Sequence, residues 1–225
     1  MLYDGVKRSI EEKVQEVFRI VSPTPNATFL QVSVTQWERH KLTMTMIRDV
    51  LMYMDKTFCV RNKKTVIYDV GMELFRDIVV KHESVLPRLQ KVLLENILSE
   101  RQHEPINRTL MKSALSMLVE VNVSSKSLYQ EEFENAFLKE TQTFYIKEAQ
   151  FFLNNNTVPD YLKKIEARLL EEEDRASAYL DESSKKKLMD VVEAEVITKY
   201  AEQLIKNSSS GAIPMFTKDM LDGRL

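Results

Sequence analysis

Glycine is the scarcest feature of this chain, which has only 4 glycines among 225 residues. Ordinary usage of about 7% would give about 16. Sheets with tight turns and loops that hold phosphate groups both depend on glycine, because it lets the backbone turn sharply or approach a ligand closely. The scarcity therefore argues against a β-rich fold and against a nucleotide-binding loop, and it favours an all-α fold.

Residues that carry out chemistry are also few. The single cysteine, Cys59, excludes an intramolecular disulfide and predicts a reducing compartment, the cytoplasm or the nucleus. His40, His82 and His103 are far apart and have no second ligand at helical spacing, so we expect no metal site. No nucleophile elbow, P-loop or dinucleotide-binding fingerprint occurs. We therefore predict a non-catalytic protein with no cofactor and no small-molecule substrate.

Charge is balanced, and apolar runs are short. The net charge of −2 offers no attraction to nucleic acid or acidic membranes, and no basic patch is interleaved with aromatic residues. No segment approaches the ~18 uncharged apolar residues of a membrane-spanning helix. We expect neither nucleic acid nor a membrane as a partner. The charge runs Glu171–Asp174 and Lys185–Lys187 are predicted to be solvated helix faces.

Apolar residues recur at steps of three and four along almost the whole chain, which predicts eight helices. Asn26 or Thr28 is expected to cap the second helix, and Ser183 or Ser184 the last, which would reach about Lys206. A row of aromatic residues at helical spacing is predicted to be a core face; it comprises Tyr129, Phe133, Phe137, Phe144 and Phe151. The expected helices cover residues 2–21, 28–58, 65–81, 87–104 and 107–120, followed by one from Ser127 that ends in the run Asn154-Asn155-Asn156, one that starts at Pro159, and the last, which follows Ser183 or Ser184 and reaches about 206.

The long second helix carries two apolar rows. One runs through Trp37, His40 and Met44 and predicts a buried face. The other consists of Met46, Val50 and Tyr53, and Tyr53 lies about 200° around the helix from Leu51 of the first row. Charged residues, Asp49 and Lys56, flank this second row. It is either covered by a neighbouring helix or is a partner site with an aromatic anchor and a polar rim.

Four segments in order resemble the cullin family, and the first two resemble its cullin-3 type. They are MIRDVLMYMDK at 46–56, GMELFRDIVV at 71–80, SLYQEEFE at 127–134 with Phe137-Leu138, and YLKKIEARL at 161–169 with Glu171-Glu172. The resemblance implies an elongated stack of helical bundles called cullin repeats. Residues 1–82 would be the last three helices of an incomplete first repeat, 83–207 a second repeat of five helices, and 208–225 the start of a third.

The resemblance also implies a function. Cullins are scaffolds of ubiquitin ligases for ubiquitin-dependent degradation, and the cullin-3 type docks BTB-domain substrate adaptors through two helices of its first repeat. Met46, Asp49, Val50, Tyr53 and Lys56 are the implied partner-binding residues. Tyr53 matches an aromatic contact. Lys56 matches a basic contact position at which a family member has arginine, so the charge is kept but the bidentate fork of arginine is lost. The other docking helix would lie upstream of Met1. The region that holds the RING-box protein and the neddylation lysine would lie outside this chain.

Two other functions fit the same sequence. A truncated cullin-like chain would act as a decoy or regulator that sequesters adaptors without recruiting ubiquitin transfer. An unrelated helical-repeat tether, for example in vesicle trafficking, is built from similar long amphipathic helices.

Overall fold

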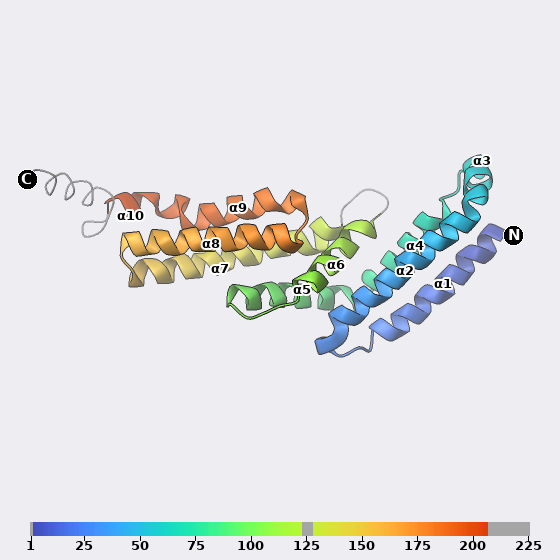
Figure 1. The fold of residues 1–225 in the computed structure, drawn as a ribbon, viewed down its shortest axis with the longest axis horizontal. Coiled ribbons are helices and arrows are strands. Elements are labelled where there is room, and N and C mark those ends of the chain that lie inside the picture. Colours follow the sequence, from blue (N-terminus) through green and yellow to red (C-terminus); the bar gives the residue numbers. More distant parts are fainter. Residues whose placement is uncertain (1, 123–127, 207–225) are drawn as a thin grey trace, which may run out of the picture. The chain divides into compact units, whose positions relative to one another are not determined.

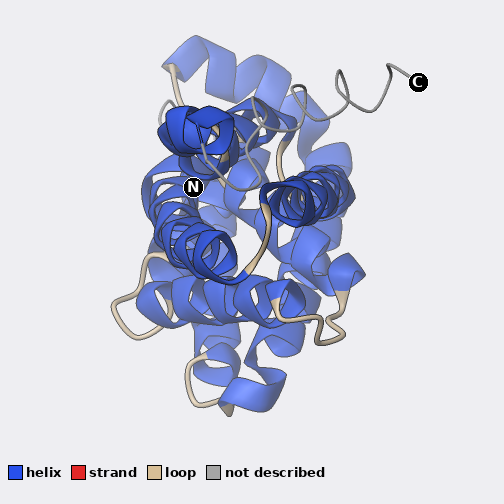
Figure 2. Cartoon of the chain, turned by 90° about the vertical axis from the view of Figure 1, so that its left-hand side faces the viewer, coloured by secondary structure: helices blue, strands red, loops and turns tan. Residues whose placement is uncertain are grey.

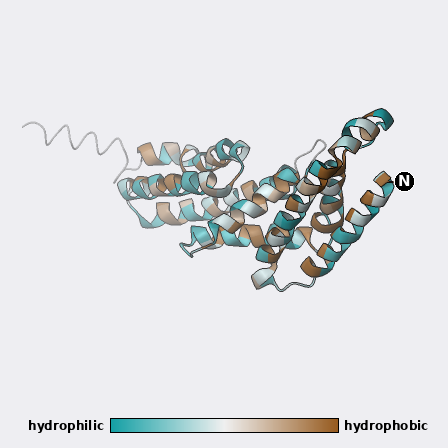
Figure 3. Cartoon of the chain, turned by 45° about the vertical axis from the view of Figure 1, so that its right-hand side comes forward, coloured by the Kyte–Doolittle hydropathy of each residue, from teal (hydrophilic) through white to brown (hydrophobic). Residues whose placement is uncertain are grey.

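The computed structural model describes residues 2–122 and 128–206, and every secondary-structure element in these ranges is a helix (Figures 1 and 2). The prediction of an all-α fold is therefore confirmed. Apolar and polar segments alternate along the helices, as expected for amphipathic elements (Figure 3). Contacts divide the chain into two compact units, Met1–Phe133 and Glu134–Leu225. The predicted boundary between two cullin repeats, near residue 82, is not defined by contacts between residues. This division therefore does not test it, and it stays a prediction.

The first unit is built on α1, α2 and α4. Helices α1 and α2 form an antiparallel pair, and both pack on α4 (Figure 1). Trp37 lies in this core, with its ring centroid 5.2 Å from that of Phe75. The elements of the unit are α1 (Leu2–Val21), α2 (Asn26–Met54), the π-helix η1 (Asp55–Cys59), α3 (Val60–Asn62), α4 (Ile67–Phe75), the π-helix η2 (Arg76–Val80), α5 (Leu86–Arg101) and α6 (Arg108–Glu120).

Arg88 of α5 holds the loop between α1 and α2. Its Nε donates to Asn26 Oδ1 at 2.6 Å, and its guanidinium also donates to the carbonyl oxygens of Ser22 and Thr24. The same guanidinium lies 4.1 Å from the centroid of the Phe29 ring, a cation–π contact. One side chain thereby satisfies loop carbonyls that would otherwise lack partners.

The predicted caps at two helix starts are wrong. Pro25 occupies the N-cap of α2 without a side-chain bond, because the side chain of Asn26 accepts from Arg88 instead. The N-cap of α9 is Asp181, whose carboxylate accepts from Ser183 N at 3.0 Å. Ser184 is buried and donates to Glu134 Oε1 at 2.6 Å.

The second unit is a set of long helices in which α9 packs against both α7 and α8 (Figure 1). The last helix is interrupted, contrary to prediction, because the backbone leaves helical geometry at Ile197, where φ is −117°. The predicted closing segment after Lys206 lies outside the described residues. The π-helix η3 (Gln130–Glu134) ends at the residue where this unit begins, and the elements that follow are α7 (Asn135–Asn155), α8 (Val158–Tyr179), α9 (Glu182–Val196), the 3-10 helix η4 (Thr198–Tyr200) and α10 (Ala201–Lys206).

The acidic run on α8 is not wholly solvated. Glu172 is fully buried, accepts from Tyr145 Oη of α7 at 2.6 Å, and pairs with Arg175 at 2.5 Å. The prediction of a solvated face is therefore wrong at this residue. Burial of the Glu172 carboxylate is possible because Arg175, one helical turn further along α8, balances its charge. Its oxygen lone pairs also accept hydrogen bonds.

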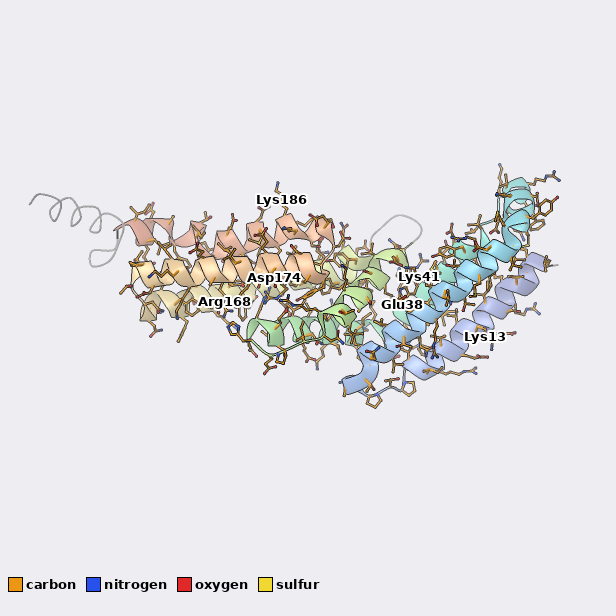
Figure 4. All side chains as sticks on the ribbon, viewed as in Figure 1. Lys13, Glu38, Lys41, Arg168, Asp174 and Lys186 are labelled. Carbon is orange, nitrogen blue, oxygen red and sulfur yellow. The ribbon has the colours of Figure 1, made fainter. Side chains whose placement is uncertain are left out.

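The lysine run on α9 is mostly paired within the unit. Lys185 lies 3.1 Å from Glu173, and Lys187 lies 2.6 Å from the buried carboxylate of Glu134. Lys186 points away from α9 into solvent (Figure 4). This run ties neighbouring elements together and is not a continuous basic patch.

The predicted aromatic core row is correct at its start and wrong at its end. Phe133 and Phe137 are buried, but the side chain of Phe151 is 62% exposed. Along α7 the buried residues instead follow the i+4 row through Thr141, Tyr145 and Ala149. Helices that pack at an angle bury inclined rows of residues at i+4 spacing. Residues at steps of seven from Phe137, such as Phe151, therefore move out of the core.

Candidate partner-binding surface

The outward row on α2 is exposed in the structure. Met46, Val50 and Tyr53 expose 60%, 81% and 81% of their surface, and Asp49 and Lys56 are exposed beside them. We call Met46, Asp49, Val50, Tyr53 and Lys56 the α2 strip. Among the described residues no helix covers the strip, so it is available to a partner.

A groove runs beside the strip between α1 and the C-terminal half of α2. It has a volume of about 610 Å³ and is almost entirely apolar. The α2 strip and the predicted core row both reach it, since Met46 and Val50 line it together with Ile47 and Leu51. The full lining comprises Leu2, Gly5, Val6, Ser9, Ile10, Lys13, His40, Thr43, Met44, Met46, Ile47, Val50 and Leu51.

A second hollow of about 400 Å³ lies at the end of the α1–α2 pair. Tyr53, Met54 and Phe58 line it from one side, and Leu2 and Tyr3 from the other. Leu2 belongs to both hollows, so the apolar surface is continuous past it. Tyr53 therefore stands at the edge of a shaped hollow, which suits an anchor residue at a protein interface.

The sequence did not reveal the groove. The apolar periodicity of residues 2–21 predicted a helix, but it did not tell which of its residues are buried: Ile10 and Val14 are, whereas Val6 is only half-buried and lines the groove. The available signal was the pair of small residues Gly5 and Ser9, which are spaced four apart on one face of α1. Such a pair leaves room beside a helix.

Charges on the rim are paired. Asp49 Oδ1 accepts from Arg48 at 3.0 Å, and the Arg48 guanidinium lies 5.6 Å from the centroid of the Tyr68 ring of α4. Both Arg48 and Asp49 are exposed, so this pair contributes little to stability. It places both signs of charge beside Val50.

The π-helix η1 follows directly after α2, two residues beyond Tyr53, and carries Lys56. Asp55 of this turn is buried and accepts from Ile67 N at 3.1 Å, so it satisfies the first backbone donor of α4. It also accepts from Cys59 Sγ at 3.4 Å. The π-turn thereby joins the end of the α2 strip to α4, and it changes the angular position of Lys56 from that of a regular α-helix.

Cys59 is buried against Asp55. Burial raises the pKa of the Cys59 thiol, and the neighbouring carboxylate raises it further. Because the thiolate is the reactive form, this environment suits a structural cysteine rather than a nucleophile.

The N-terminal end of α1 is fixed to the α3–α4 loop. Tyr3 Oη donates to the carbonyl oxygen of Thr65 at 2.9 Å, and Lys64 Nζ lies 4.5 Å from the centroid of the Tyr3 ring. Lys64 also lies 3.4 Å from Asp4. These contacts hold Leu2 in place at the junction of the two hollows.

His40 lies at the bottom of the groove, where α2 crosses α4. Its Nε2 is 2.9 Å from the carbonyl oxygen of Gly71, and its ring stacks on Phe75 at 4.9 Å. A Cβ atom at Gly71 would overlap the side chain of Met44, so glycine allows the two helices to approach closely. Burial lowers the pKa of His40, with the bond to Gly71 opposing part of the effect.

The lowered pKa of His40 predicts a loss of stability in acid. The neutral imidazole is favoured in the folded chain, so the unfolded chain binds more protons as the pH falls below the ordinary value of ~6.5. Stability is fully present above that pH and declines until the pH reaches the folded-state pKa. Urea unfolding followed between neutral pH and mild acid should show this decline. In His40→Gln, which can keep the Gly71 hydrogen bond, the same interval should be flatter. An equal slope in both proteins would contradict the assignment.

Reactive or metal-binding clusters are not part of this surface. Within 2–122 and 128–206, no group of three or more histidine, cysteine or carboxylate residues is placed to hold a metal ion. Nor does any helix in the described part of the chain have the length and apolarity needed to cross a bilayer.

The helices and the α2 strip define an all-α protein with an exposed apolar strip beside an apolar groove. A family model, the Cullin alpha solenoid domain, matches residues 1–224, and the chain belongs to the cullin family. It is similar to Cullin-3 of Dictyostelium discoideum, with 36% identity over 222 residues that cover 99% of this chain and 29% of the relative. It also resembles Cullin-3A of Arabidopsis thaliana, with 36% identity over 218 residues that cover 97% and 29%. Cullin-4A of Homo sapiens is 33% identical over 210 residues, which cover 92% and 27%. The chain thus spans less than a third of these relatives.

Proposed function

We propose that this chain is a scaffold segment of a cullin-RING ubiquitin ligase and that its α2 strip docks a BTB-domain substrate adaptor. The chain itself would hold the adaptor and perform no catalysis. It would act in the cytoplasm or the nucleus, where such adaptors and their substrates meet. The observation that carries the proposal is the exposure of Tyr53 and Val50 on a chain that belongs to the cullin family.

The chemistry of the strip supports adaptor docking. An exposed tyrosine beside aliphatic residues and a polar rim is the usual composition of an interface hot spot. Tyr53 also borders a hollow that can receive a side chain from a partner. Relatives named Cullin-3 match nearly the whole chain, which supports the cullin-3 type of adaptor.

Replacing Tyr53 by alanine is expected to weaken adaptor binding by at least about 2 kcal/mol, which is roughly thirtyfold in affinity. The reason is that alanine removes the anchor ring while leaving α2 intact, because the ring is exposed and supports no core contact. Affinities should be measured by calorimetry against a panel of purified BTB-domain proteins.

Phe151→Ala is the matched control, because Phe151 is also an exposed aromatic residue but lies in the second unit. It should leave the affinities unchanged. If the wild-type chain binds no member of the panel, docking of BTB proteins is wrong for this chain. If Tyr53→Ala binds as tightly as wild type, the site lies elsewhere.

A further inference from the structure

Two dipeptides of a hydroxyl residue and proline stand side by side in the loop between α1 and α2. They are Ser22-Pro23 and Thr24-Pro25, and the whole sequence contains no other Ser-Pro or Thr-Pro pair. Proline-directed protein kinases recognise a serine or threonine that proline follows directly. The loop lies at the end of the α1–α2 pair opposite to the start of the chain, from which the 20-residue helix α1 separates it (Figure 1).

Of the two hydroxyl groups, that of Thr24 is better placed for a kinase, because kinases hold their substrates in an extended conformation. Thr24 lies outside both helices, as expected for a residue before proline, and Pro25 is extended with φ −61° and ψ 153°. Ser22 still bonds as a helical residue, since its N–H donates to Phe18 O at 2.9 Å. The Thr24 hydroxyl donates to the carbonyl oxygen of Ile20 at 2.7 Å, an exposed bond that a kinase can open.

A half-buried cation that bonds only to uncharged groups faces this loop. In the described part of the chain, the acceptors of Arg88 are Asn26 Oδ1 and the carbonyl oxygens of Ser22 and Thr24. The guanidinium already contacts the carbonyl oxygen of Thr24, so a phosphate on the same residue comes within its reach after rotation about the Cα–Cβ bond. An arginine beside a phosphorylated hydroxyl is the arrangement by which phosphorylation orders a loop.

From these features we infer that Thr24 is a phosphorylation site for a proline-directed serine/threonine kinase and that Arg88 binds the phosphate. In the transfer, Thr24 Oγ1 forms a bond to the γ-phosphorus of ATP, and the bond between that phosphorus and the β–γ bridging oxygen breaks. ADP leaves, and the hydroxyl proton passes to the catalytic base of the kinase. The inference is independent of adaptor docking.

Phosphorylation should fasten the loop more tightly. The phosphate adds about two negative charges beside the C-terminal end of α1, where the helix dipole disfavours an anion. It also removes the exposed hydrogen bond from Thr24 to Ile20. Both losses are smaller than the gain, because hydrogen bonds from a guanidinium to an ionised acceptor are roughly twice as strong as neutral ones. The phosphorylated chain should therefore unfold at a higher urea concentration than the unmodified chain.

The first test is phosphate transfer to the 225-residue chain. A purified mitogen-activated protein kinase with Mg–ATP should add one phosphate, which fragmentation mass spectrometry should place on Thr24. Thr24→Val keeps the shape of the side chain without its hydroxyl and should take up no phosphate at this position. Pro25→Ala keeps the hydroxyl but removes the residue that the kinase recognises, so the rate should fall at least about tenfold. A wild-type chain that takes up no phosphate, or takes it up only at Ser22, would overturn the inference.

The second test concerns Arg88. Phosphorylation should raise the urea midpoint of the wild-type chain. In Arg88→Gln it should lower the midpoint, because the repulsion at the end of α1 remains while the cation is gone. Arg88→Lys keeps the charge without the fork of donors and should show part of the wild-type rise. An equal change of midpoint in the wild type and in both variants would show that Arg88 does not bind the phosphate.

The same proteins separate this inference from adaptor docking. Thr24 and Arg88 are not part of the α2 strip, so Thr24→Val should bind BTB-domain proteins with the affinity of wild type. A chain that is phosphorylated at Thr24 but binds no BTB protein contradicts the proposed function alone. A chain that binds BTB proteins but is not phosphorylated at Thr24 contradicts this inference alone.

Discussion

Replacing Glu172 by alanine is expected to lower the free energy of unfolding by about 3–5 kcal/mol. The carboxylate is fully buried between α7 and α8, where it accepts from Tyr145 Oη at 2.6 Å and pairs with Arg175 at 2.5 Å. The substitution removes the negative charge and leaves the buried guanidinium and phenol without this acceptor. Urea unfolding followed by far-ultraviolet circular dichroism measures the effect.

Glu173→Ala is the matched control, since it is the next residue, carries the same charge, and is 52% exposed at its side chain. Its loss should stay below about 1 kcal/mol. Replacing both partners with apolar residues of similar size, Glu172→Leu with Arg175→Met, should recover much of the stability lost in Glu172→Ala. A Glu172→Ala chain as stable as the control would show that the pair is not buried in solution.

Trp37→Ala should cost a comparable amount, about 3–5 kcal/mol, in the first unit. The indole is fully buried where α2 packs on α4, and its ring lies 5.2 Å from Phe75. Alanine would leave a cavity that the long, tightly packed helices can close only in part. The unfolding midpoint in urea, followed by circular dichroism because the variant lacks the only tryptophan, should fall accordingly.

Two further variants serve as controls for Trp37→Ala. Trp37→Phe keeps an aromatic ring in the core and should lose less than Trp37→Ala. Glu38→Ala, at the exposed neighbouring position labelled in Figure 4, should lie within about 0.5 kcal/mol of wild type. A loss below about 1 kcal/mol for Trp37→Ala would contradict the packing of α2 on α4.

Most of the helical fold could be read from the sequence, because helices follow from local periodicity and from proline and capping positions. The helix expected over residues 107–120, for example, is α6 (Arg108–Glu120), and Asn107 is its N-cap, with a side chain that accepts from Leu110 N at 2.9 Å. The errors came from interactions that local spacing does not contain. Asn26 could not be recognised as a partner of Arg88, which is 62 residues away, and Glu172 could not be recognised as buried.

The sequence likewise predicted only part of the candidate site. The angle between two apolar rows on one helix predicted that Met46, Val50 and Tyr53 face away from the core row, but it left open whether a neighbouring helix covers them, and the structure shows them exposed. The groove beside them could not be predicted, because its shape depends on how α1 and α2 pack and on the absence of a side chain at Gly5. The π-turn at Asp55 was also unforeseen, since its cause is a long-range bond to Ile67 N.

The contact of Arg88 with the α1–α2 loop has a consequence for synthesis on the ribosome. Arg88 is more than 60 residues away from the loop in the sequence. A growing chain therefore cannot form these hydrogen bonds until Arg88 has left the exit tunnel. Until then the entropic cost of ordering the α1–α2 loop is not offset by these hydrogen bonds. The packing of α1 and α2 on α4 does not have to wait for Arg88, because α4 is synthesised first, so the hairpin can dock before its loop is fixed.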